Sequence, residues 1–198
     1  RIKVSSRAGI NGAPAFSPDG RKLVVTLGGL GGNLDIYVLD LATRQFSRLT
    51  RHRAIDTEGT WAPDGRSIYF TSDRSGGPQV YRIEVGGGTA ERVTFEGSYN
   101  ARPRLSPDGK RVALVHLDRG NYRIGVLDLD DKDLLIVSNG TQDESPSFAP
   151  NSDSIIYATR EGRNGVLEMV SADGLYRQRL GSRAGDIREP VWSPFPRY

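Results

Sequence analysis

The sequence predicts an all-β fold of the β-propeller class, made of four-stranded blades with a repeat of about 44 residues. One observation is a recurring turn motif, found as Ser17-Pro18-Asp19-Gly20, Ala62-Pro63-Asp64-Gly65, Ser106-Pro107-Asp108-Gly109, Ala149-Pro150-Asn151-Ser152 and Ser193-Pro194. The successive motif prolines are 45, 44, 43 and 44 residues apart. A second observation is that short apolar runs fill each interval, without convincing amphipathic helical spacing. Such a unit must stack on copies of itself, because one blade cannot bury both of its faces.

Each repeat is predicted to begin with the innermost strand of a blade, which ends at the turn motif. A proline stands four residues before the motif proline in every repeat except the second, where Gly59 takes its place. Proline cannot donate a ladder hydrogen bond, so we expect it as the first residue of a strand facing the central channel. The large apolar residue two places before the motif proline is predicted to be buried between blades: Phe16, Trp61, Leu105 and Phe148.

The turn motif is predicted to form a hairpin into the second strand. Proline presets one dihedral, Asp or Asn bonds the local backbone, and glycine allows a positive φ. In the fourth motif Asn151 or Ser152 must take the glycine's conformation. Near-continuous apolar runs then predict second strands buried on both faces, at 23–26, 68–71, 112–115 and 155–158. Third strands follow at 36–39, 80–83, 124–127 and 167–170, and fourth strands end at Leu49, Val93, Val137 and Leu180.

These elements predict four complete blades, flanked by one further strand at each end. The blades span approximately residues 14–50, 59–94, 103–138 and 146–181. Residues 1–6 are expected to be the outermost strand of a preceding blade, and residues 190–194 the innermost strand of a closing blade. We therefore expect the chain to be part of a larger ring.

The composition limits the classes of function. The formal net charge of +3 arises from 27 basic and 24 acidic residues spread along the chain, which gives little support for nucleic-acid binding. No apolar stretch approaches the length of a membrane span, so no direct membrane insertion is expected. The absence of cysteine excludes disulfides, thiol catalysis and Cys-ligated zinc. Neither His52 nor His116 has metal-ligand spacing, and both are expected at the surface or the rim.

Four segments resemble the TolB family of the bacterial Tol-Pal envelope system. They are PAFSPDGRKLVV from residue 14, TSDRSGGPQVYRIEVGGGTAERVTFEGSYN from residue 71, RLSPDGKRVALV from residue 104 and PVWSP from residue 190. The turn motif alone is shared with the propellers of prolyl oligopeptidase-like and tricorn-like serine peptidases. The segment 71–100 and the C-terminal segment are more specific.

The resemblance implies a six-bladed propeller preceded by an α/β domain, with export to the periplasm by a signal peptide that this chain does not contain. It also implies a protein that is not an enzyme and that binds the peptidoglycan-associated lipoprotein Pal on one propeller face. Other Tol proteins would bind through the N-terminal domain, and colicin-type peptides are further candidate partners. The family's roles are outer-membrane integrity, cell division and protein import.

A candidate binding rim lies on the loops that precede the innermost strands. In a propeller these loops converge at one channel mouth, and loops on a rigid scaffold carry function. Asn11, Asp56, Asn100 and Asp143 stand seven residues before the motif prolines, with Ile187 in the fifth repeat. An alternative role for these Asn and Asp residues is an Asx-type turn that shapes entry into the strand. The loops after the second strands reach the same face.

The predicted partner-binding residues are therefore Ile10, Asn11, Gly12, Ala13, Asp56, Thr57, Glu58, Ser72, Asp73, Arg74, Tyr99, Asn100, Ala101, Arg102, His116, Asp118, Asp143, Glu144, Ser145, Ile187, Arg188 and Glu189. No cofactor and no catalytic residue is predicted. A structural calcium in the channel is an alternative use of Asp56, Glu58, Asp143, Glu144 and Glu189. The acidic run from Asp128 to Asp133 is expected to be a solvated hairpin on the far face, since it lacks the pattern of a calcium-binding loop.

Two other functions stay open at this point. One is a propeller that gates substrate access to a serine peptidase, whose catalytic domain would lie elsewhere. The other is a sugar-acting or lyase-type propeller enzyme, which would need paired carboxylates or metal-binding histidines in its channel. The sequence contains no GxSxG motif.

Overall fold

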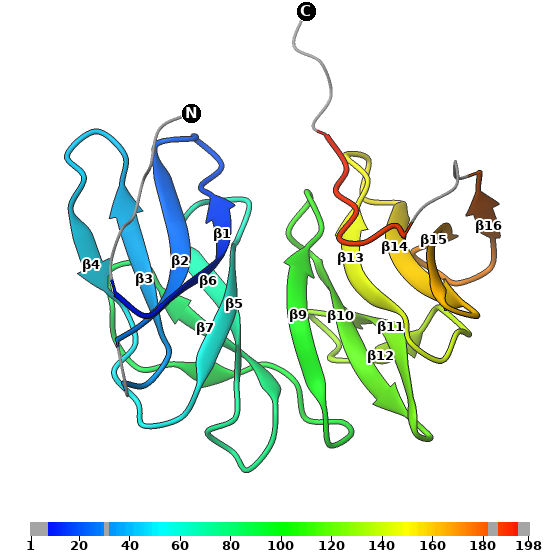
Figure 1. The fold of residues 1–198 in the computed structure, drawn as a ribbon, viewed down its shortest axis with the longest axis horizontal. Coiled ribbons are helices and arrows are strands. Elements are labelled where there is room, and N and C mark those ends of the chain that lie inside the picture. Colours follow the sequence, from blue (N-terminus) through cyan, green and yellow to red (C-terminus); the bar gives the residue numbers. More distant parts are fainter. Residues whose placement is uncertain (1–7, 30–31, 182–185, 194–198) are drawn as a thin grey trace, which may run out of the picture. The chain divides into compact units, whose positions relative to one another are not determined.

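The computed structural model describes residues 8–29, 32–181 and 186–193, and in these residues it contains sixteen β-strands and no helix. The strands form four antiparallel sheets, each built from four strands consecutive in sequence (Figure 1). This confirms the prediction of an all-β fold with four-stranded blades. No helix in the described residues is long and apolar enough to cross a membrane.

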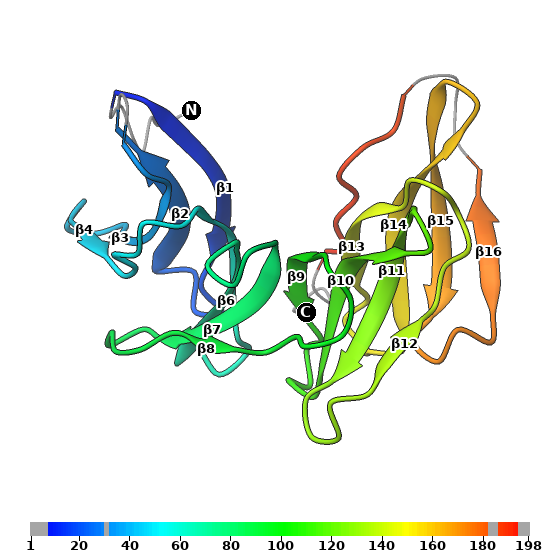
Figure 2. The same ribbon diagram turned by 90° about the horizontal axis from the view of Figure 1, so that it is seen from below.

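The four blades have the following strands. Blade 1 contains β1 (Ile10–Phe16), β2 (Lys22–Gly28), β3 (Asp35–Asp40) and β4 (Phe46–Arg48). Blade 2 contains β5 (Asp56–Trp61), β6 (Ser67–Ser72), β7 (Gln79–Glu84) and β8 (Glu91–Arg92). Blade 3 contains β9 (Asn100–Leu105), β10 (Arg111–Asp118), β11 (Asn121–Asp128) and β12 (Leu134–Ile136). Blade 4 contains β13 (Glu144–Phe148), β14 (Ser154–Glu161), β15 (Asn164–Ser171) and β16 (Arg177–Leu180), seen side by side in Figure 2.

The chain divides into two compact units, Arg1–Phe95 and Glu96–Tyr198. Unit 1 contains blades 1 and 2, and unit 2 contains blades 3 and 4. In each unit the innermost strand of the second blade packs against the first blade: β5 contacts β1, β2 and β3, and β13 contacts β9, β10 and β11. The seam between two blades is therefore the elementary core of this fold.

The second and third strands supply most of this core. In blade 2, all six residues of β6 are buried, as the continuous apolar run predicts. In unit 1, Val24 and Ile36 of blade 1 pack with Trp61 and Phe70 of blade 2. In unit 2, residues of β10 and β11 pack with Phe148 and Tyr157 in the same way. Burial of these side chains stabilises each pair of blades through the hydrophobic effect.

The seam residues differ from the prediction in the first blade of each unit. Trp61 and Phe148 are only 7% and 6% exposed, as predicted. Phe16 is 67% exposed and Leu105 is only partly buried, so the prediction was wrong for both. Phe16 belongs to the first described blade, and no described blade precedes it to cover that face.

The innermost strands begin earlier than predicted, at Ile10, Asp56, Asn100 and Glu144. The recurring proline, or Gly59 in blade 2, lies at a bulge inside the strand and is not its first residue, since the pairing with the second strand shifts register there. At a bulge the ladder leaves a residue unpaired, so a proline without an N–H is tolerated inside the strand.

The turn motif forms as its chemistry predicts. In the first motif the Ser17 hydroxyl donates to the Asp19 carboxylate (2.6 Å), and the Lys22 N–H donates to the Ser17 hydroxyl (2.9 Å). The hydroxyl bond and the Arg21 N–H lower the pKa of Asp19. The motif glycines have φ of 70° to 75°, and Ser152 takes this conformation in the fourth motif with φ 65°.

The two flanking strands predicted at the ends of the sequence have different outcomes. The strand predicted over residues 1–6 lies outside the described residues. Residues 190–193, predicted as part of an innermost strand, are irregular. The Trp192 N–H instead donates to the Ser147 hydroxyl of β13 (3.1 Å).

Candidate functional site

Strand register brings the two sets of predicted rim loops to the same end of each blade. The first residue of the innermost strand pairs with the last part of the second strand: Ile10 with Gly28, Asp56 with Ser72, Asn100 with His116, and Glu144 with Ala158. Loops before the innermost strand and after the second strand are therefore neighbours. We call this end of each blade the rim, as in the sequence prediction.

Asp56 anchors the rim of blade 2 through a buried ion pair. Its side chain is fully buried, and one Arg74 nitrogen donates to both carboxylate oxygens (2.9 and 2.8 Å). Arg74 also donates to the Ser72 hydroxyl (3.0 Å) and lies over the rings of Phe70 and Tyr81. The sequence prediction had assigned Asp56 and Arg74 to partner binding, but their polar groups bind each other.

Asn100 occupies the equivalent position in blade 3 and is also fully buried. Its amide donates to the Glu96 carbonyl (2.7 Å), and its side-chain oxygen lies 2.8 Å from Nδ1 of His116. His116 is 8% exposed and pairs with Asn100 at the rim, so the expectation of a rim histidine holds, but the side chain is buried there and does not lie at the surface. Burial lowers the pKa of His116, although Asp118 and Glu96 oppose this shift. The neutral imidazole is therefore favoured in the folded state.

Asp143, at the rim of blade 4, accepts hydrogen bonds from uncharged donors. The carboxylate is fully buried and accepts hydrogen bonds from the hydroxyls of Ser138 and Thr159 and from the Gly140 N–H (2.9 Å). Because Thr159 lies on the second strand and Ser138 follows the outermost strand of blade 3, Asp143 ties three parts of unit 2 together.

In blades 2 to 4, the buried side chains of Asp56, Asn100 and Asp143 therefore hold the rim loops in place through hydrogen bonds. None of these three side chains is exposed, so none offers a direct contact to a partner. Asn11 of blade 1 differs: it is exposed, and its amide donates to the Gly9 carbonyl (3.1 Å). Ile187, in the fifth repeat, uses its backbone N–H to bond the Gly165 carbonyl (3.1 Å).

Two residues after each of these five positions, the backbone adopts the left-handed conformation. Ala13, Glu58, Arg102, Ser145 and Glu189 all have φ between 46° and 57°. Each directly precedes the proline or glycine of the innermost segment. Residues other than glycine are rarely found in the left-handed backbone conformation, and such strained positions cluster at functional sites. The left-handed backbone is thus common to five predicted rim residues, four of which lie at a strand bulge.

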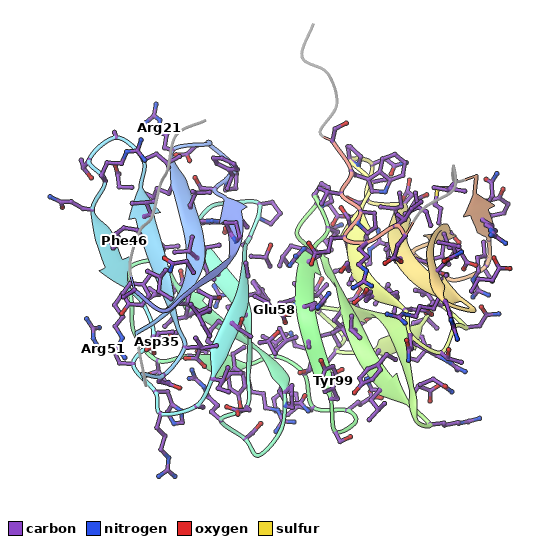
Figure 3. All side chains as sticks on the ribbon, in the orientation of Figure 1. Arg21, Asp35, Phe46, Arg51, Glu58 and Tyr99 are labelled. Carbon is purple, nitrogen blue, oxygen red and sulfur yellow. The ribbon has the colours of Figure 1, made fainter. Side chains whose placement is uncertain are left out.

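Five of the predicted rim residues of unit 2 come together around a cavity of about 290 Å³. Tyr99 lies at the start of β9 (Figure 3) and packs edge-on against Tyr122, with ring centroids 5.2 Å apart. Arg102 crosses from blade 3 to blade 4, where it donates to the Ser145 hydroxyl (2.8 Å) and pairs with Glu144 (3.4 Å). The complete lining is Tyr99, Arg102, Val115, Tyr122, Gln142, Asp143, Glu144, Arg160 and Arg188.

The other predicted residues take part in local contacts at the rim. Asp118 pairs with Arg123 (2.6 Å), and Arg188 pairs with Asp186 (2.8 Å). The Asp73 carboxylate accepts the Ile55 N–H (2.8 Å). In unit 1, the Thr26 hydroxyl of blade 1 lies 3.4 Å from the Thr57 hydroxyl of blade 2 and accepts the Glu58 N–H (3.3 Å).

Sequence reasoning missed four residues of the cavity: Val115, Tyr122, Gln142 and Arg160. The loop containing Arg160 was expected on this face, but nothing in the repeat distinguished that residue. Tyr122 is the second residue of β11, and it also pairs with the Thr141–Asp143 segment, a contact that no periodicity predicts.

The described residues contain no group of three or more acidic or histidine side chains placed to hold a metal ion. Asp56 and Asp143, named for the calcium alternative, use their oxygens on protein donors. In the far hairpin the Asp128 carboxylate accepts the N–H groups of Asp130 and Asp131, which lowers the pKa of Asp128.

Comparison with known proteins identifies the family to which these blades belong. Residues 1–196 match the TolB beta propeller domain (PD40) family. The chain belongs to this family. Its blades are therefore those of a TolB-type β-propeller, and the resemblance seen in the sequence is confirmed.

Similar proteins carry the same family name. Over 116 residues, or 58% of this chain and 26% of the relative, the chain is 55% identical to the Tol-Pal system protein TolB of Xanthomonas campestris pv. campestris. The crystal structure of TolB from Acinetobacter baumannii is 48% identical with a TM-score of 0.89, covering 96% of this chain and 48% of that one. The chain thus spans about a quarter to a half of the length of these TolB proteins.

More distant structures share the fold alone. An oligogalacturonate lyase in complex with manganese is 18% identical with a TM-score of 0.68, covering 85% of this chain and 51% of that one. A puromycin-hydrolyzing peptidase of Mycobacterium tuberculosis is 17% identical with a TM-score of 0.71, covering 90% of this chain and 29% of that one. Family membership with TolB is therefore the comparison that bears on function.

Proposed function

We propose that this chain is a protein–protein interaction module of the Tol-Pal envelope system, which works in the periplasm and is not an enzyme. Its rim binds the lipoprotein Pal, and this contact supports outer-membrane integrity and cell division. The observation that carries the proposal is membership of the TolB propeller family over residues 1–196.

The geometry of the rim supports this proposal. In each of blades 2 to 4 a buried Asp or Asn holds the loops, so the exposed rim residues sit on a rigid base. A partner that binds such a preorganised surface loses little free energy in ordering it. Tyr99, Arg102 and Arg188 add the aromatic and guanidinium groups that dominate many interfaces.

The wider set of partners also belongs to the proposal. Colicin-type peptides would compete with Pal for the rim, and other Tol proteins would contact an N-terminal domain outside this sequence. A calcium ion near the rim acids would be a structural addition to the same surface. None of these functions requires nucleic acid or insertion into a membrane.

Titration calorimetry of the full chain with Pal tests the proposal. We expect Tyr99→Ala to lose about 1 to 3 kcal/mol of binding free energy, as for an anchor residue near the centre of an interface. Arg102→Ala should lose a similar amount, because its guanidinium is fixed by Ser145. Circular dichroism of both variants should report unchanged folding.

Asp131→Lys is the matched control. Asp131 is exposed in the turn between β11 and β12, at the end of the sheet opposite to the rim. Its effect should stay below about 0.5 kcal/mol at physiological salt, since distant exposed charges are screened. Loss of binding in Asp131→Lys together with normal binding in the rim variants would assign the partner to the other face.

A further inference from the structure

We propose that the cavity of unit 2 is a subsite for one carboxylate side chain, aspartate or glutamate, presented by the protein partner. This inference refines the proposed function, because it names the chemistry of the group that the rim accepts. Three arginines, Arg102, Arg160 and Arg188, line the cavity together with two tyrosines.

The charges in the cavity leave one arginine for a ligand. Arg102 pairs with Glu144, and Arg188 pairs with Asp186. Among the described residues, no carboxylate forms an ion pair with Arg160, whose side chain is exposed at the end of β14. Asp143 uses its two oxygens on Ser138, Gly140 and Thr159. The pKa of Asp186 is lowered mainly by the Gly165 N–H and by Arg188, and to a smaller extent by the charge of Arg160. An incoming carboxylate would therefore meet a guanidinium that acts on Asp186 only at longer range and has no described carboxylate in direct contact. Arginine binds carboxylates in a planar, bidentate way.

The size and walls of the cavity favour a single side chain. Its volume of about 290 Å³ lies at the lower limit of pockets that hold whole small molecules. The edge-on pair of Tyr99 and Tyr122 forms an apolar wall on which the methylene groups of an acidic side chain would pack. Gln142 adds an amide that can donate to an oxygen of the ligand.

The acidic residues of the lining argue against a more highly charged ligand. Glu144 and Asp143 also line the cavity, so a doubly charged phosphate would meet repulsion that a singly charged carboxylate largely avoids. The cavity also lacks the long basic track that nucleic-acid backbones require.

The first experiment uses a small probe on the full chain. Nuclear magnetic resonance follows the side-chain signals of Arg160 and Tyr122 during titration with N-acetyl-aspartate methylamide at millimolar concentration, and with the matching asparagine derivative. We expect the aspartate probe alone to shift these signals, and Arg160→Ala to abolish the shift. Equal responses to both probes, or none to either, would overturn the subsite.

Arg163→Ala is the matched control. Arg163 is exposed in the same hairpin turn but does not line the cavity. This variant should respond to the aspartate probe like the unchanged chain. A loss of response equal to that of Arg160→Ala would mean that the probe senses only the general positive charge of the turn.

The second experiment uses Pal and keeps the two proposals apart. Arg160→Ala should weaken Pal binding roughly tenfold, the effect of losing one charged hydrogen bond. In double-mutant cycles, one Asp→Asn or Glu→Gln change in Pal should lose its effect when Arg160 is absent. Failure of the unchanged chain to bind Pal would reject the proposed function while the probe result stands. Normal Pal binding by Arg160→Ala, without coupling to any carboxylate, would reject the subsite alone.

Discussion

Blades 1 and 2 use the same repeat positions in opposite ways. Trp61 and Phe16 both stand two residues before a motif proline, yet Trp61 is 7% exposed and Phe16 is 67% exposed. Asp56 and Asn11 both stand seven residues before it, yet Asp56 is fully buried and Asn11 is exposed. The difference is the preceding blade, which β5 packs against and β1 lacks among the described residues. In this fold a residue's contribution to stability depends on its neighbour blade as much as on its own identity.

Trp61→Ala is expected to have the largest effect on stability. The indole fills the seam of unit 1 among Val24, Ile36 and Phe70, and its N–H donates to the Ala15 carbonyl (3.1 Å). Truncation leaves a cavity and an unpaired carbonyl, so we expect a loss of about 3 to 5 kcal/mol in the free energy of unfolding. Urea denaturation followed by circular dichroism measures this loss. A loss below 1 kcal/mol would show that the seam does not depend on this side chain.

Asp56→Ala should come next. It removes the carboxylate partner of Arg74, whose side chain is only 16% exposed, and leaves that guanidinium poorly solvated. Removal of one partner from a buried ion pair costs about 3 to 5 kcal/mol, and we expect about 2 to 4 because Arg74 keeps some access to water. The double variant Asp56→Leu with Arg74→Met should recover part of the loss. If the double variant were as unstable as the sum of both single variants, the pair would not be the source of the effect.

The sequence predicts some features of this fold and of the rim but not others. Blade number, strand order and the turns followed from proline spacing and apolar runs, because each depends on local chemistry that the repeat displays. The bulge at Pro14, Pro103 and Pro146 was missed, since proline fits the start of a strand and a bulge equally well. The burial of Asp56 and His116 was missed because it depends on partners 16 to 18 residues away, which no periodic pattern identifies.

Asn100→Ala should destabilise unit 2 less than Asp56→Ala destabilises unit 1. The bond between Asn100 and His116 involves no ion pair, so its loss leaves one polar imidazole nitrogen buried without its partner. We expect about 1 to 3 kcal/mol by urea denaturation. Asn100→Asp sharpens the comparison, because a carboxylate beside His116 would favour the protonated ring and reduce the penalty at low pH. Equal losses for Asn100→Ala and Asp56→Ala would contradict the distinction between the two rims.

The burial of His116 predicts a dependence of stability on pH. The folded pKa of His116 lies below its ordinary value of 6.5, because burial disfavours the charged ring. The unfolded chain therefore binds the proton more readily, and the contribution of His116 is fully present above pH 6.5 and is lost as the pH falls toward the folded pKa. One proton sets an upper limit of about 1.4 kcal/mol per pH unit for this slope.

His116→Gln should flatten the slope between pH 6.5 and the folded pKa, whereas His52→Gln should leave it unchanged. His52 is exposed and serves as the control, since these two are the histidines of the sequence. Thermal unfolding at a series of pH values in one ionic strength measures both variants. An unchanged slope in His116→Gln would assign the pH dependence to the carboxylates.

Phe16→Ala should have the smallest effect and provides the closest test of the comparison between blades. Phe16 occupies the position of Trp61, but two-thirds of its surface is exposed in this chain, so truncation removes little buried apolar area. We expect a change within about 0.5 kcal/mol by urea denaturation, as for most exposed positions. A loss of several kcal/mol would mean that the face of blade 1 is covered in solution, for example by a second copy of the chain. Sedimentation analysis would then show an oligomer that dissociates in Phe16→Ala, and the contrast with Trp61 would disappear.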